Sequence, residues 1–91
     1  MPRVRVHLPR ALLQFWDGAR VVEVDAPDLA AAIRRVGERH PGLDARIVDE
    51  QGRVRAFVNV FLNQVAVRDA PSLVALKDGD VVHVLPSVAG G

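Results

Sequence analysis

The chain has 91 residues, a hydrophobic share of 49%, a charged share of 25% and a formal net charge of +1. This length fits one domain with one modest core, and the charge balance gives no general attraction to nucleic acid or membranes. The absence of cysteine excludes disulfides, thiolate metal sites and thiol nucleophiles. No apolar run approaches the roughly 20 residues of a membrane span, and the start lacks a secretory signal. We therefore expect a cytoplasmic protein.

The first half of the chain predicts two strands and a helix. Residues 3–8 and 20–25 alternate apolar with polar side chains, which is typical of half-buried strands that pair as a hairpin. Asp28 can cap a helix, because its carboxylate can accept from the free amides of the first turn. The helix ends at Pro41-Gly42. Its buried stripe, at i, i+3, i+4 and i+7 spacing, consists of Leu29, Ala32, Ile33 and Val36.

The second half predicts an irregular segment over 43–55 and then further strands. Residues 57–63 alternate most strongly, with Val58, Val60 and Leu62 on one face. The other expected elements are a short strand at 65–68, a helical turn at 71–76, a turn at 77–80, and a strand at 81–85 that Pro86 stops.

This order favours an α+β fold in which one main helix packs across a mixed sheet of about five strands. The helix is expected to cross over from the hairpin to a strand beside the first one, with a right-handed connection. This is the β-grasp arrangement, the fold of ubiquitin. We expect residues 1–86 to form this single domain and residues 87–91 to form a flexible tail that ends in Gly90-Gly91.

The two closing glycines indicate where chemistry takes place. Glycine tolerates backbone angles closed to other residues, so a Gly-Gly end can thread a narrow channel and present the Gly91 carboxylate to an enzyme. Adenylation turns a carboxylate into a mixed anhydride, and a sulfur donor can then replace the AMP to leave a thiocarboxylate. Residues Val88 and Ala89 are expected to contact the same partner. The alternative is a chain end without a role.

The face of the sheet opposite the helix is a second candidate site. It would carry Phe57, Phe61, His83 and Leu85, and we predict that it is the surface on which a partner docks. In the alternative arrangement, residues 44–55 or the 9–18 loop fold over this face. The remaining side chains predicted there are Arg3, Arg5, His7 and Val81.

Other reactive residues favour structural roles. His7, His40 and His83 lack metal-ligand spacing, so no metal site is expected. Asp78 and Asp80 lie in a Lys-Asp-Gly-Asp turn. None of the glycines builds a phosphate-binding loop, so we expect no cofactor on the chain, and ATP would bind the partner. The side chains of Ser72 and Ser87 have no evident base, and Arg34, Arg35 and Arg39 fit a solvated helix face.

Several stretches resemble the MoaD/ThiS group of sulfur carriers across nearly the whole chain. They are His40-Pro41-Gly42-Leu43, Val58-Asn59-Val60, Asn63 and, most specifically, the closing run from Leu76 to Gly91. The segment 44–56 is the least similar. Residues 57–63 with Val67-Arg68, and residues 85–91, look most like the CysO-type carrier that supplies sulfide for cysteine synthesis. The position after Pro86 is Ser87, where the molybdopterin synthase small subunit more often has a second proline.

The resemblance implies a protein carrier that is not itself an enzyme. It implies an E1-like activating partner that uses ATP, and a Gly91 thiocarboxylate. The sulfur acceptor would be a pyridoxal-phosphate-dependent cysteine synthase or, in the alternative branch, the molybdopterin synthase large subunit. Two alternatives of other classes remain: a ubiquitin-like protein modifier, and an interaction module in which Gly90-Gly91 plays no part.

Overall fold

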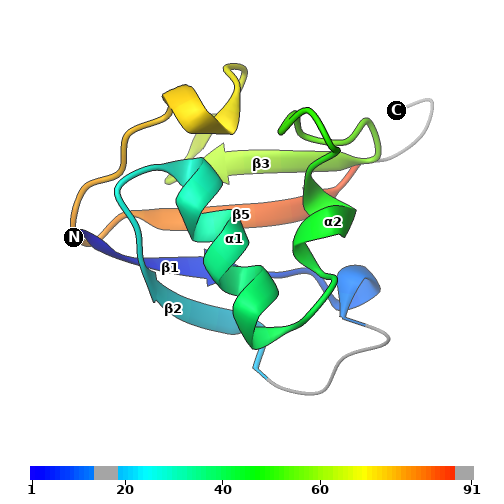
Figure 1. Ribbon diagram of the computed structural model, residues 1–91, viewed down its shortest axis with the longest axis horizontal. Helices are drawn as coiled ribbons and strands as arrows, with labels where there is room; N and C mark the ends of the chain where they lie inside the picture. The colour runs from blue at the N-terminus through cyan, green and yellow to red at the C-terminus, as the bar shows by residue number, and fades with distance from the viewer. Residues whose placement is uncertain (14–18, 88–91) are drawn as a thin grey trace.

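The computed structural model describes residues 1–13 and 19–87 as one sheet with helices on one side (Figure 1). No helix within these residues is long and apolar enough to cross a membrane. In chain order the elements are β1 (Arg3–His7), the 3-10 turn η1 (Arg10–Leu12), β2 (Val21–Asp25), α1 (Leu29–Arg39), α2 (Asp44–Ile47), β3 (Val58–Leu62), β4 (Val65–Ala66), η2 (Pro71–Leu73) and β5 (Val81–Pro86).

The sheet has five strands in the order β2-β1-β5-β3-β4. Strand β1 pairs antiparallel with β2 and parallel with β5, and β3 pairs antiparallel with both β5 and β4. This confirms the β-grasp fold. The predicted position of the strand after the helix is wrong, because β5 and not β3 lies beside β1. Alternation specifies which face a residue occupies, but it does not specify the neighbouring strand.

Helix α1 confirms the predicted cap and buried stripe. The Asp28 carboxylate accepts a hydrogen bond from the Ala31 amide at 2.8 Å. At the other end the amide of His40 donates to the Val36 carbonyl, and the His40 side chain is buried. The residues of α1 that reach the core are Leu29, Ala31, Ala32, Ile33 and Val36. They pack against the valines of β1, β2, β3 and β5 that the alternation places on this side.

The segment predicted to be irregular holds the short helix α2. Leu43 and Ile47 are fully buried, and α2 lies against α1 on the same side of the sheet (Figure 1). A side chain at Gly37 would collide with the Asp44 side chain, so glycine allows the two helices to approach. The segment after α2 closes through a bridge between Val48 and Val54. Residues 43–54 therefore extend the helical layer.

Several strand and turn boundaries differ from the sequence predictions by one to three residues. Strand β4 covers only Val65–Ala66, η2 ends at Leu73, and β5 includes Pro86, which pairs with Val58. Pro86 fits because residues 85 and 87 supply the hydrogen bonds to β3 here, as the amide of Ser87 donates to the Phe57 carbonyl. The missing N–H of Pro86 would point toward β1, which has already ended at His7.

Asn63 forms the turn after β3 with a positive φ of 57°. Its side-chain oxygen accepts from the Val81 amide at 3.0 Å, and its side-chain nitrogen donates to Asp80 at 3.2 Å. Asn63 therefore ties the end of β3 to the start of β5. Asparagine suits this position because it tolerates the left-handed region better than most residues.

We predict that Asn63→Gly lowers the free energy of unfolding by about 1 kcal/mol, because the side-chain hydrogen bonds are lost. Asn63→Ala should lower the free energy of unfolding by about 1 kcal/mol more than Asn63→Gly does, because alanine also has to adopt a left-handed conformation. Urea unfolding followed by circular dichroism measures both changes. Equal losses in the two variants would show that backbone strain plays no part.

Candidate functional site

The predicted reactive end lies outside the described residues, since Val88, Ala89, Gly90 and Gly91 are not among them. The last described residue is Ser87, whose amide donates to the Phe57 carbonyl at 2.8 Å. This bond continues the β3–β5 ladder by one step beyond Pro86. The chain is therefore fixed to the sheet through Ser87, the first residue of the predicted tail.

The residues predicted for the outer face come together on three adjacent strands. His7 on β1 and Phe61 on β3 are both in register with His83 on β5. Leu85 follows two residues later on β5 and is 45% exposed, and Phe57 precedes β3 and is 52% exposed. Phe61 and His83 are half-buried. The structure therefore places an apolar and aromatic patch beside the last described residue.

Two segments, residues 44–55 and the 9–18 loop, were the alternatives for covering this face, and their described residues lie elsewhere. Residues 43–54 belong to the helical layer on the opposite side, as shown above. Leu12 and Leu13, in the first part of the 9–18 loop, are buried in the core. Residues 14–18 lie outside the described residues. Within the described residues, the patch therefore remains open.

His7 and His83 form a ring pair at the centre of the outer face. Their centroids are 4.7 Å apart and the rings are tilted by 40°. Burial lowers the pKa of His7 below its ordinary value of 6.5, and the neighbouring His83 and Arg5 lower it further. Near neutral pH His7 is therefore uncharged, which suits an apolar contact. No group of three or more potential metal ligands occurs in the described part of the chain.

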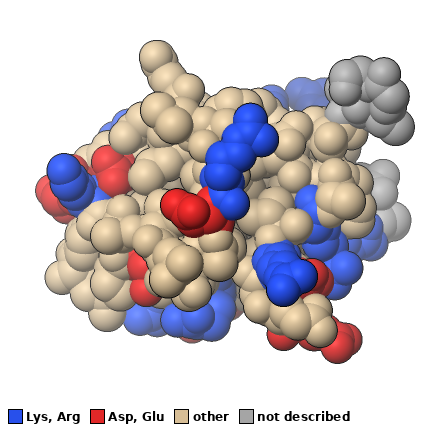
Figure 2. All heavy atoms as spheres, turned by 90° about the horizontal axis from the view of Figure 1, so that it is seen from above, with Lys and Arg blue, Asp and Glu red and all other residues tan. Residues whose placement is uncertain are grey.

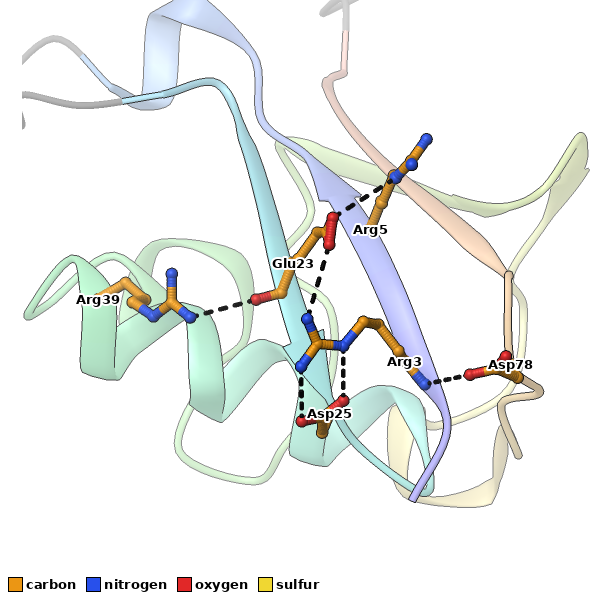
Figure 3. A network of polar contacts seen from close by, with 6 residues as sticks. All are labelled: Arg3, Arg5, Glu23, Asp25, Arg39 and Asp78. Atoms are coloured by element: carbon orange, nitrogen blue, oxygen red, sulfur yellow. Dashed lines mark hydrogen bonds and ion pairs between the residues drawn. The ribbon is translucent and has the colours of Figure 1, made fainter.

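A charged network occupies the other end of the same face (Figure 3). Arg3 binds both oxygens of Asp25, at 3.1 and 3.2 Å, and lies 3.8 Å from Glu23. Arg5 lies 4.0 Å from the second oxygen of Glu23, and the backbone amide of Arg3 donates to Asp78. The hydrogen bond between Arg3 and Asp25 raises the pKa of Arg3 and lowers the pKa of Asp25.

The alternation of the sequence places Arg3 and Arg5 on this face but does not identify their partners. The signal was present, because the alternation put Glu23 on the outward side of its strand. What was missing was the register that sets Arg3 opposite Asp25 and Arg5 opposite Glu23. All of these side chains are largely exposed, so their contribution to stability is small.

Asp78 and Asp80 accept separate backbone hydrogen bonds at the predicted turn. Asp80 accepts from the amide of Lys77 at 2.8 Å, Asp78 accepts from Arg3, and Gly79 has the positive φ that the turn requires. On α1, Arg35 pairs with Glu38 at 3.3 Å. These contacts fit the structural roles predicted for both groups.

Comparison with known proteins gives consistent results. Residues 10–91 match the ThiS family. Sulfur carrier protein CysO of Mycobacterium tuberculosis (strain ATCC 25618 / H37Rv) is 34% identical over 91 residues, which cover 97% of this chain and 98% of that protein. A chain in the crystal structure of the Amycolatopsis orientalis BexX/CysO complex is 36% identical, with a TM-score of 0.84 over 97% of this chain and 99% of that chain.

A third relative bears a different name. Small archaeal modifier protein 3 of Haloferax volcanii is 37% identical over 68 residues, which cover 74% of this chain and 73% of that protein. The family match includes the closing glycines and the outer-face residues of β3 and β5. This chain belongs to the ThiS family, the ubiquitin-like MoaD/ThiS group that its own residues resemble.

Proposed function

We propose that this chain is a sulfur carrier that delivers sulfide for cysteine biosynthesis from a thiocarboxylate on Gly91. The observation that carries the proposal is the alignment with sulfur carrier protein CysO over 97% of this chain. The match to the ThiS family also runs through Gly90 and Gly91. The chain itself would act as a cosubstrate, and partner enzymes would supply the catalysis.

The proposed loading takes place in two steps on an E1-like partner. The Gly91 carboxylate attacks the α-phosphorus of ATP and releases pyrophosphate, which leaves an acyl adenylate. A sulfur donor then replaces AMP at the acyl carbon, and the thiocarboxylate remains. The acceptor would be a pyridoxal-phosphate-dependent synthase, and the molybdopterin synthase large subunit is the alternative acceptor.

The outer face is the proposed docking surface for the activating partner. Phe57, Phe61, His83 and Leu85 form an exposed patch beside Ser87, so a partner that covers them would also hold the start of the tail. The charged network around Arg3 would then lie at the rim of the contact. An apolar centre with a polar rim is the usual anatomy of a protein interface.

A protein modifier is the second candidate function, and the similarity to small archaeal modifier protein 3 favours it. Both functions use an activated Gly91, but the acceptor differs. A modifier gives a series of high-mass adducts in cells, whereas a carrier returns to its original mass after the sulfur is transferred. Transfer from loaded chain to a cysteine synthase or to the molybdopterin synthase large subunit separates the two carrier branches.

We predict that incubation with the cognate activating enzyme, ATP and sulfide exchanges one oxygen of the chain for sulfur. Intact mass spectrometry measures this exchange. A chain that lacks Gly90 and Gly91 should stay unmodified, because the carboxylate can no longer reach the partner's site. Normal loading of this truncated chain would contradict the carrier proposal.

Phe61→Asp should lower the rate of loading by about tenfold or more, because a carboxylate replaces a ring at the centre of the docking surface. Leu73→Asp is the matched control, since Leu73 is 75% exposed and lies on η2, away from this face. Circular dichroism checks that both variants fold. Equal loading of the two variants would rule out the outer face as the docking surface.

Affinity for the activating partner should fall as the pH drops below about 6.5, the ordinary pKa of histidine. The pKa of His7 is lowered by burial, and a partner that covers His7 would lower it further. Protonation of His7 therefore weakens the complex. The charged and titratable groups that act on His7 are His83 and Arg5, and no carboxylate among the described residues raises the pKa of His7. Titration calorimetry at several pH values should show that the affinity of His7→Gln depends less on pH than the affinity of the unchanged chain. Identical pH profiles would remove His7 from the contact.

A further inference from the structure

The edge of β3 next to β4 is only partly covered. Strand β3 has five residues and β4 has two, in register with Leu62 and Phe61. One more hydrogen bond follows, from the Val67 amide to the Val60 carbonyl at 2.9 Å. Among the described residues, no backbone hydrogen bond joins β3 to residues 68–71. The pairing on this side therefore ends halfway along β3.

The backbone direction of β3 follows from its pairing with β5. Phe57 and Asn63 exchange hydrogen bonds with the β5 side, so the odd-numbered residues face β5. Val58 and Val60 therefore direct their backbone groups away from β5. The Val58 amide donates to the Arg55 carbonyl and the Val60 carbonyl accepts from Val67, so the Val58 carbonyl and the Val60 amide are the groups at the uncovered edge. Their side chains are buried on the helix side, so only their backbone is available at this edge.

A groove of about 680 Å³ lies along this edge. One wall is the segment 53–56, the other is the segment 66–71, and the floor includes Val58, Asn59 and Val60. Figure 2 looks down on this side of the molecule and shows separate basic side chains with uncharged surface between them. The groove is open, and its lining includes the consecutive residues 58–61.

The charge of the groove is positive. Its charged residues are Arg53, Arg55 and Arg68 against a single carboxylate, Asp69. The guanidinium of Arg55 donates to the Ala45 carbonyl, while within the described residues Arg53 and Arg68 form no ion pair. Two arginines are thus free to bind carboxylates, which guanidinium groups do with paired hydrogen bonds.

We propose that this groove binds an extended acidic segment of a partner protein, which adds as a strand to the open edge of β3. Main-chain hydrogen bonds to the Val58 carbonyl and the Val60 amide would give affinity, and Arg53 and Arg68 would select acidic side chains. The site lies where Val58 pairs with Pro86, so the bound segment would sit beside the start of the tail. The proposal does not depend on the chemistry of Gly91.

The test uses a fluorescein-labelled peptide that alternates glutamate with valine. Fluorescence anisotropy should show binding to the full chain, and ¹⁵N–¹H spectra should show the largest shift changes at Val58, Val60 and Arg68. Methylation of the central peptide nitrogen should abolish binding, because it removes the strand hydrogen bonds. No binding at millimolar peptide, or shift changes only elsewhere, would overturn the proposal.

Charge reversal supplies the matched variants. Arg68→Glu should weaken peptide binding by about tenfold or more, whereas Arg34→Glu on the exposed side of α1 should not change it. If both variants weakened peptide binding equally, the effect would come from the net charge of the chain, and the proposed specific site would be contradicted. Sedimentation of the chain alone gives a further check. A dimer that is lost in Arg68→Glu would show that a second copy of the chain, and not a partner protein, occupies this edge.

Discussion

Strand β5 pairs with β1 on one side and with β3 on the other, and the arrangement of both candidate surfaces depends on this position. Its inward side chains Val82 and Val84 are 0% and 1% exposed, because the helical layer covers them. Its outward side chains His83 and Leu85 lie in the middle of the open face. The same strand thus connects the core to the outer face, and the chain leaves the sheet from a central strand.

The central position also explains how the end of the sheet is held. The hydrogen bond from Ser87 to Phe57 extends the β3–β5 ladder past Pro86. The pairing of β5 with its two neighbours uses only backbone groups. The outward side chains of β5 therefore remain exposed on the outer face. A held end of the sheet and an open outer face are therefore compatible on one strand.

The side chains and the backbone of strand β3 contribute to two different surfaces. Its odd-numbered side chains, including Phe61, contribute to the outer face, while the backbone of Val58 and Val60 faces the groove at the edge. Unpaired edges are a hazard for aggregation, and flanking charges such as Arg53 and Arg68 protect against pairing with further copies. In the proposal above the same charges select acidic segments, so protection and recognition would have one physical origin.

The two ends of the outer face differ in their energetics. The Arg3, Glu23 and Asp25 contacts are exposed to solvent and contribute little to folding. The apolar end, with Phe57 and Leu85 about half exposed, gains most from being covered. Charges at one end and apolar surface at the other therefore favour one orientation of a docked partner.

Much of this protein follows from its sequence alone. Alternation determined the faces of Val4, Val6, Val58 and Val60, and the Asp28 cap with its apolar stripe determined α1, because these signals are local. The closing run to Gly91 was enough to indicate the family. Only the tertiary structure decided that β5 lies between β1 and β3, that Arg3 meets Asp25, and that β4 covers only part of the edge of β3. Strand order and register arise from contacts between residues far apart in the chain, and no local pattern specifies them.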